Sequence, residues 1–420
     1  MAAKRLFVPV LLLLMGLAGL LFVSLRPSLA ARLPGQIVVM PDHPQWLARY
    51  PDRPFFMCGP GDPEGFLYRG ARRADGARDG DQEALIRKLA GTGANCIYLI
   101  AVRSHGGDGD PTQNPFVDND PTKGLNPAVL DQWERWFNAM DRAGIVIYFF
   151  FYDDSARVWN TGDRVCAAEK AFFEGLVNRF EHHKNLIWCL AEEYQEALTP
   201  RRAHKLAAII RAADDHDHVI AVHKLPGTSF AEFADDPYVD QFAMQLEAGE
   251  AEAYHRAVVS AWQQAQGRYN VNMAEAPDFG TGQKARRTEW ACAMGGAYVM
   301  VIEMDIASTP RADLEDCGRL VHFFERTDFW RMAPHDELAL GATKYVLARP
   351  GHSYIAYRAG GGQRMGLRDM AAGAYVLVWF DCATGKTIRQ THVRVRRGDN
   401  LWPVPLSLGD EVALYVKRTG

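Results

Sequence analysis

The sequence has 420 residues, of which 48% are hydrophobic and 23% are charged. A chain of this length exceeds what one hydrophobic core usually fills, and its composition is that of a globular protein rather than a disordered one. The formal net charge of -4 gives no electrostatic reason to expect nucleic acid or an anionic membrane surface as a partner.

Residues 1–30 have the pattern of an export segment. Lys4 and Arg5 precede an apolar run that only Gly, Pro and Ser interrupt, and Ser28-Leu29-Ala30 has the small-x-small spacing of a signal-peptidase site. The run is long for a cleaved signal peptide and just long enough to span a bilayer, so a signal peptide and an N-terminal anchor both fit. Because basic residues precede the run, we expect the rest of the chain outside the cytoplasm, in a periplasmic, secreted or membrane-anchored protein.

From Pro54 onward, short apolar runs alternate with amphipathic helical stretches, which is the pattern of βα units on a parallel sheet. The predicted strands are residues 55–58, 96–102, 145–151, 186–191, 219–222, 241–246, 270–274 and 298–302. The predicted helices are residues 81–90, 127–143, 167–179, 200–213, 250–266, 287–294 and 314–324. The helix after Asn126 is the clearest, because Asn126 is an N-cap, Pro127 suits the first helical position and Gly144 stops the helix.

Eight strands that alternate with helices predict a (β/α)8 TIM barrel rather than an open doubly wound sheet. No Gly-rich dinucleotide fingerprint follows the first strand. After Trp330 the pattern changes to short strands separated by Gly, Asp and Pro turns, which predicts a small all-β sandwich. These strands are residues 345–348, 354–358, 373–380, 392–395 and 412–417. We therefore expect an α/β barrel domain over residues 36–332 and a β-sandwich over residues 338–420.

The active site of a TIM barrel lies at the carboxyl ends of its strands, so polar residues that follow the apolar runs are the candidates. They are Asp62, Asp153, Glu192, Glu193, His223, Gln245, Glu275 and Glu303. A cavity lined by this many carboxylates would repel anionic substrates and raise the pKa of at least one member. Glycosidic cleavage uses such a set, because it needs one neutral acid and one ionised carboxylate.

Residues 185–194 resemble the fourth-strand segment of retaining glycosidases with the clan A barrel, in which an Ile-Trp strand runs into the acid/base. Residues 55–59 and 270–275 resemble the first and seventh strands of that group, and a Glu ending the seventh strand is its nucleophile. Residues 287–296 resemble the next helix of the apiosidase-like branch. Segments around Tyr345 and Trp379 resemble the collagen-binding-type β-sandwich domain that this branch carries.

The resemblance implies a retaining glycoside hydrolase in which Glu193 is the acid/base and Glu275 is the nucleophile. Clan members commonly place Asn before the acid/base to hold the sugar 2-hydroxyl, whereas this chain has Glu192 there. Alternation along the strand puts Glu193 on the side of the small residues, which suits the crowded barrel interior and favours Glu193 over Glu192. Substrate binding is expected from Asp62, Asp153, Glu192, His223, Gln245 and Glu303.

We expect a poly- or oligosaccharide substrate outside the cytoplasm, and neither a cofactor nor a metal. The seven cysteines have no short spacing, which indicates mostly buried free thiols and leaves one disulfide open. Two other functions stay open: a non-catalytic carbohydrate-binding or cell-surface protein on a degenerate barrel, which Glu192 favours, and an exopolysaccharide-processing enzyme, which a retained anchor favours. The sugar, the linkage and the oligomeric state are not determined by the sequence.

Overall fold

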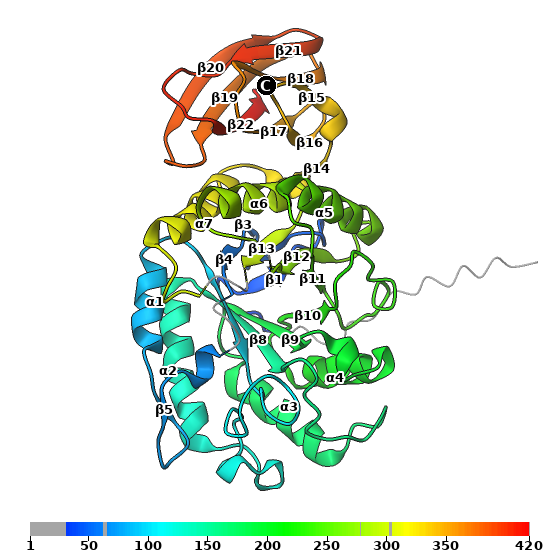
Figure 1. The fold of residues 1–420 in the computed structure, drawn as a ribbon. Coiled ribbons are helices and arrows are strands. Elements are labelled where there is room, and N and C mark those ends of the chain that lie inside the picture. The colour runs from blue at the N-terminus through cyan, green and yellow to red at the C-terminus, as the bar shows by residue number, and fades with distance from the viewer. Residues whose placement is uncertain (1–30, 62–64, 278, 302–304, 420) are drawn as a thin grey trace, which may run out of the picture.

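A computed structural model gives the fold of the chain and describes residues 31–61, 65–277, 279–301 and 305–419 (Figure 1). Among these residues, no helix is long and apolar enough to cross a membrane. The predicted signal peptide or anchor at residues 1–30 lies outside the described residues. The limits predicted for the two domains stay predictions.

Eight parallel strands form a barrel, as predicted. They are β4 (Cys58–Pro60), β7 (Cys96–Ile100), β8 (Val146–Tyr152), β9 (Leu186–Ala191), β10 (Val219–Lys224), β11 (Gln241–Gln245), β12 (Asn270–Glu275) and β13 (Tyr298–Val301). In the sheet they follow the order β4-β13-β12-β11-β10-β9-β8-β7. Two backbone hydrogen bonds of 3.0 Å join the first and last strands of this sheet. The Asn95 N–H donates to the carbonyl of Cys58, and the Tyr98 N–H donates to the carbonyl of Gly61.

Helices surround the barrel in the predicted alternation. They are α1 (Gln82–Ala90), α2 (Pro127–Ala143), α3 (Ala167–Phe180), α4 (Pro200–Ala213), α5 (Ala251–Ala265), α6 (Gly282–Met294) and α7 (Arg311–Phe324). The Asn126 side chain caps α2 by accepting a hydrogen bond from the Ala128 N–H, and Gly144 ends the helix in the left-handed region with φ 73°. α6 begins five residues before its predicted start, because its first turn carries Gln, Lys and Arg, and apolar periodicity therefore does not mark it.

A three-stranded antiparallel sheet that the sequence did not predict lies at the amino ends of the barrel strands. It contains β1 (Ile37–Val39), β2 (Leu47–Arg49) and β3 (Arg53–Phe55). The Ile37 N–H donates to the carbonyl of Lys184, just before β9, and the Leu47 N–H donates to the hydroxyl of Tyr298, the first residue of β13. Phe55, predicted to begin the first barrel strand, pairs with β2 instead, and the barrel strand starts at Cys58. A two-stranded hairpin, β5 (Ala71–Arg72) and β6 (Arg78–Asp79), precedes α1.

The C-terminal region is a sandwich of two antiparallel sheets, as predicted. The larger sheet contains β14 (Ala333–Pro334), β16 (Tyr345–Arg349), β17 (Ser353–Ala359), β22 (Glu411–Arg418), β19 (Gly373–Asp381) and β20 (Thr387–Val395). The smaller contains β15 (Ala339–Gly341), β18 (Arg364–Met370) and β21 (Gly398–Pro403). β18 and β21 escaped prediction because several of their side chains are exposed, which interrupts the apolar alternation.

The sandwich packs against the helices α5, α6 and α7 rather than over the strand ends (Figure 1). Trp290 of α6 stacks on Tyr357 of β17, with ring centroids 5.4 Å apart and planes inclined by 5°. Beside this stack, Glu411 of β22 accepts hydrogen bonds from Arg286 at 2.7 Å and from Arg287 at 3.0 Å. An aromatic contact and two ion pairs to the buried Glu411 therefore join the two parts of the chain.

Trp290→Ala should destabilise the protein by about 3–5 kcal/mol, because it removes a fully buried indole and leaves a cavity between α6 and β17. Urea unfolding followed by circular dichroism measures the loss. Trp402→Ala, at a partly buried position of β21, is the control and should cost less. Equal losses from the two substitutions would contradict the structural role assigned to Trp290.

Candidate active site

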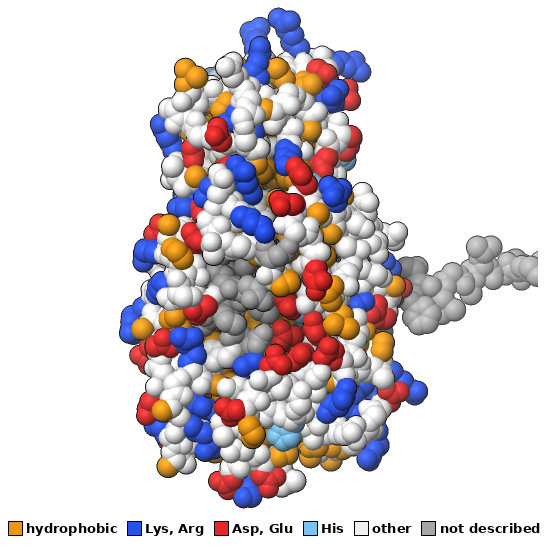
Figure 2. Space-filling model, in the orientation of Figure 1, with side chains coloured by type: hydrophobic (Ala, Val, Ile, Leu, Met, Phe, Trp, Pro, Cys, Tyr) orange, Lys and Arg blue, Asp and Glu red, His pale blue; other side chains and the backbone are white. Residues whose placement is uncertain are grey.

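The barrel brings six of the predicted site residues onto neighbouring strand ends. They are Asp153 after β8, Glu192 and Glu193 after β9, His223 in β10, Gln245 at the end of β11 and Glu275 at the end of β12. The strands β8 to β12 are successive neighbours in the sheet, so these residues lie along one arc of the barrel rim. Figure 2 shows acidic side chains gathered in one region of the barrel surface. The other two predicted residues, Asp62 and Glu303, lie outside the described residues.

Glu193 has a backbone conformation that non-glycine residues rarely adopt, with φ 36° and ψ 52° in the left-handed region. The Glu192 N–H still donates to Tyr152 of β8 at 3.0 Å, so the chain leaves the sheet at Glu193. The Glu193 N–H donates to Nδ1 of His223 at 3.0 Å, which holds this conformation. Backbone strain of this kind costs about 1–3 kcal/mol and concentrates at functional sites.

The environment of Glu193 favours its protonated form. Burial raises the pKa of this carboxyl, a hydrogen bond from Gln245 lowers it, and the nearby carboxyls of Glu196 and Asp108 raise it again, with a net upward shift. A half-buried Glu with a raised pKa is suited to donate a proton near neutral pH.

Glu275 lies at the end of β12 beside two donors. The Gln245 amide donates to Oε1 at 2.8 Å, and Nε2 of His223 lies 3.5 Å from Oε2. Gln245 thus contacts Glu275 and also forms a hydrogen bond with Glu193.

His223 is fully buried and connects the same two glutamates. Because Nδ1 accepts a hydrogen bond from the Glu193 backbone, the proton of the neutral ring resides on Nε2, which faces Glu275. Burial lowers the pKa of His223 to about 3, so the ring is neutral at ordinary pH. It therefore presents a neutral N–H group toward Glu275, at 3.5 Å, rather than a positive charge.

Glu192 is buried next to Asp153. Burial raises the pKa of Asp153, whereas a hydrogen bond from Glu192 and the charge of Arg103 lower it. Arg103 donates to Asp153 at 3.2 Å, and the backbone N–H of Asp108 donates to the same oxygen at 3.1 Å. Glu192, which was expected to bind substrate, thus contacts Asp153 and lies on the same rim as Glu193.

Asp154 and Glu196 belong to this carboxylate group although they were not among the predicted site residues. Oxygens of Asp154, Glu193 and Glu196 all lie within 4.8 Å of one another. Burial, followed by the charges of neighbouring carboxylates, raises the pKa of Asp154 to about 7. Asp154 directly follows Asp153 at the end of β8, so its position after a strand could have identified it from the sequence. Glu196 lies on the short helix after Glu193, and nothing in the sequence pattern marks it as a site residue.

Residues 47–297 match the family described as Apiosidase-like, catalytic domain. A solved structure described as a glycoside hydrolase is 15% identical, with a TM-score of 0.71 over 92% of this chain and 97% of that chain. A glycoside hydrolase family 5 structure from Bacteroides vulgatus is 14% identical, with a TM-score of 0.68 over 92% and 94%. A β-mannanase structure from the blue mussel Mytilus edulis is 11% identical, with a TM-score of 0.54 over 70% and 98%. No curated protein matches the sequence. At these identities the structural likeness concerns the fold.

The raised pKa of Asp154 predicts a pH-dependent cost to stability. Between pH 3.8, the ordinary pKa, and about pH 7, the unfolded chain releases this proton while the folded chain keeps it. The carboxyl thus contributes stability that is present below about pH 4 and lost by about pH 7. As the pH rises through this window, the free energy of unfolding of Asp154→Asn should rise relative to that of the wild type. The difference should reach only about 1 kcal/mol, because solvent screens the group.

Urea unfolding of both proteins across the window measures this difference. Asp399→Asn, at an exposed position of β21, controls for the removal of one surface charge. A difference between wild type and Asp154→Asn that stays constant with pH would contradict the shift assigned to Asp154.

Proposed function

Because the chain belongs to the family of apiosidase-like catalytic domains, we propose that it is a retaining glycoside hydrolase with Glu275 as nucleophile and Glu193 as general acid and base. The observation that carries the proposal is the pair of side chains shared by these glutamates. His223 accepts from the Glu193 backbone and faces Glu275, and Gln245 forms hydrogen bonds with both carboxyl groups. The two glutamates therefore share two neighbouring side chains while their carboxyls have different environments, which suits the separate roles of double displacement.

In the first step, a carboxylate oxygen of Glu275 attacks the anomeric carbon and the bond to the leaving oxygen breaks. The proton of Glu193 moves to that oxygen, which leaves a glycosyl ester on Glu275. In the second step, a water oxygen attacks the same carbon while Glu193 takes the water proton. The ester bond breaks, and both glutamates return to their starting states.

The surroundings support this division of roles. Glu275 accepts a hydrogen bond from Gln245, whereas burial and neighbouring carboxylates raise the pKa of Glu193 and favour its protonated form. Because His223 is neutral, it does not offset the negative charge of the carboxylates along this arc. The site therefore favours a neutral sugar over an acidic one.

The proposed substrate is a poly- or oligosaccharide outside the cytoplasm. Support for export comes from the apolar N-terminal run and the Ser28-Leu29-Ala30 pattern. The competing function, carbohydrate binding without turnover, draws on Glu192, which stands where clan members commonly have Asn. Titration calorimetry of a glycan that binds but is not cleaved would favour that alternative.

Glu193→Gln should lower turnover by about 10²–10⁴-fold, because it removes proton transfer to the leaving oxygen. Glu275→Gln should lower it at least as much, since an amide cannot form the glycosyl ester. A panel of aryl glycosides and intact polysaccharides supplies the substrate, and reducing-sugar release measures turnover. Glu174→Gln, on α3 beside Lys170, is the matched control and should keep wild-type rates. Full turnover in both active-site variants would refute the assignment.

Glu192 is proposed to take the place of the usual Asn by using its carboxyl, held by Asp153, as a substrate contact. Glu192→Gln should stay within about tenfold of wild-type kcat/KM, because the amide has the same shape and can still donate. Glu192→Ala should lose about 10–100-fold, the worth of one hydrogen bond to a charged or polar partner. Equal kcat/KM for wild type and the alanine variant would show that Glu192 does not contact substrate.

A further inference from the structure

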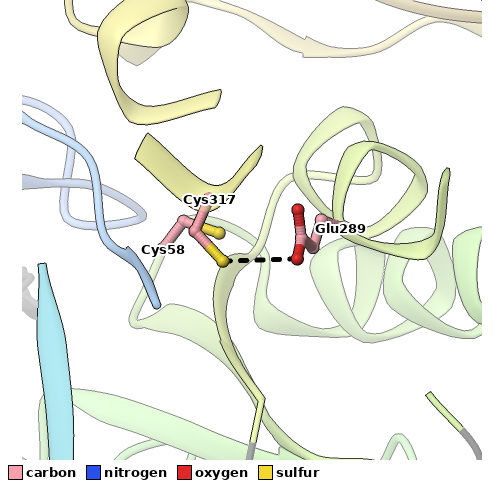
Figure 3. Close-up of side chains that lie close together, drawn as sticks. All are labelled: Cys58, Glu289 and Cys317. Atoms are coloured by element: carbon pink, nitrogen blue, oxygen red, sulfur yellow. Dashed lines mark hydrogen bonds between the residues drawn. The ribbon is translucent and has the colours of Figure 1, made fainter. Parts of the chain in front are cut away.

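A second cluster of reactive side chains lies away from the rim, where helices α6 and α7 pack on the first barrel strand. It consists of Cys58 of β4, Glu289 of α6 and Cys317 of α7 (Figure 3). One ligand atom from each residue lies within 4.8 Å of the other two, and all three side chains are buried. The Cys317 thiol donates to Oε1 of Glu289 at 3.3 Å.

Glu289 is the unusual member of this cluster. Its side chain is 0% exposed, and Oε2 has no hydrogen-bond donor among the described residues. The nearby Arg286 does not serve it, because its guanidinium donates to Asp316 at 3.0 Å and to Glu411 at 2.7 Å. A carboxyl group buried with an unsatisfied oxygen is costly, so its retention in the core calls for a partner.

The chemistry of the three side chains indicates which partner would fit. Two thiols and one carboxyl become anionic ligands when a divalent ion is present, and thiolates select borderline or soft metals over Ca²⁺ or Mg²⁺. Without such an ion, burial opposes negative charge on these three side chains. A cation of charge two would offset this penalty directly.

We propose that Cys58, Glu289 and Cys317 bind one thiophilic divalent cation of the Zn²⁺ type in a structural site. Two S–H bonds and the O–H bond of the Glu289 carboxyl break as two metal–sulfur bonds and one metal–oxygen bond form, and three protons pass to solvent. Three protein ligands leave the fourth tetrahedral position to a water molecule. The ion would join β4 to α6 and α7, the helices on which the sandwich packs. This site departs from the expectation, drawn from the sequence, that no metal binds.

A disulfide between Cys58 and Cys317 is the competing use of the same thiols. It would consume both S–H groups and so remove the donor that Glu289 now has from Cys317. The Glu289 carboxyl would then be buried, and neither of its oxygens would accept a hydrogen bond from Cys58 or Cys317. The position of Glu289 therefore favours the ion over the disulfide.

The test is metal content of the full-length protein after equilibration with Zn²⁺ and dialysis against metal-free buffer. Wild type should retain one zinc per chain by elemental analysis, and Cys317→Ser should fall to background. Cys382→Ser replaces a buried cysteine of the sandwich and should retain one zinc. Glu289→Gln should raise the Kd for Zn²⁺ about tenfold or more while keeping both thiolates.

Two further measurements on the wild type decide the matter if the cysteine variants do not fold. Co²⁺ in place of Zn²⁺ should give a thiolate-to-cobalt charge-transfer band. Thiol titration of the metal-free, denatured chain should find all seven cysteines reduced. Absence of both bound zinc and the cobalt band would overturn the proposal, and a count of five thiols would assign Cys58 and Cys317 to a disulfide instead.

Discussion

Two backbone hydrogen bonds between β7 and the chain at β4 close the parallel sheet into a barrel, and this closure determines where every polar strand end lies. In a closed parallel sheet all carboxyl ends meet on one rim, so residues far apart along the chain become neighbours there. The amino ends form the other rim, which β1 to β3 cover. One rim is thus devoted to packing and the other carries acidic and polar groups.

A few residues of the carboxylate rim are held in conformations or environments that cost free energy. Glu193 adopts a strained backbone, and Asp154 holds its proton up to about pH 7 because burial and neighbouring negative charge oppose ionisation. His223 accepts a hydrogen bond from the Glu193 backbone and lies 3.5 Å from Glu275, to which Gln245 donates. Different environments for neighbouring carboxyls reduce the stability of the fold, but they also separate the pKa values of these groups, as acid–base catalysis requires.

The sandwich is attached so that it leaves this rim alone. Its contacts with α6 include the stack of Trp290 on Tyr357 and the arginines that meet Glu411, and its contacts with α7 include Phe323, whose ring lies 5.1 Å from that of Phe380. The same two helices carry Glu289 and Cys317, so the proposed metal ion would stabilise the part of the barrel that bears the second core. The sandwich therefore packs on α6 and α7 and does not cover the proposed active site.

The sequence by itself determined the parts of the structure that depend on local periodicity. β9 and α4 were predicted with the bounds they have, because an uninterrupted apolar run and a capped amphipathic stretch leave few alternatives. The places of Glu193 and Glu275 at strand ends follow from the same alternation. Only the tertiary structure decided the covering sheet β1 to β3, the sharing of His223 and Gln245, the pKa of Asp154 and the meeting of Cys58 with Glu289. Each of these depends on contacts between segments distant along the chain, where burial and neighbouring charge, rather than periodicity, determine the outcome.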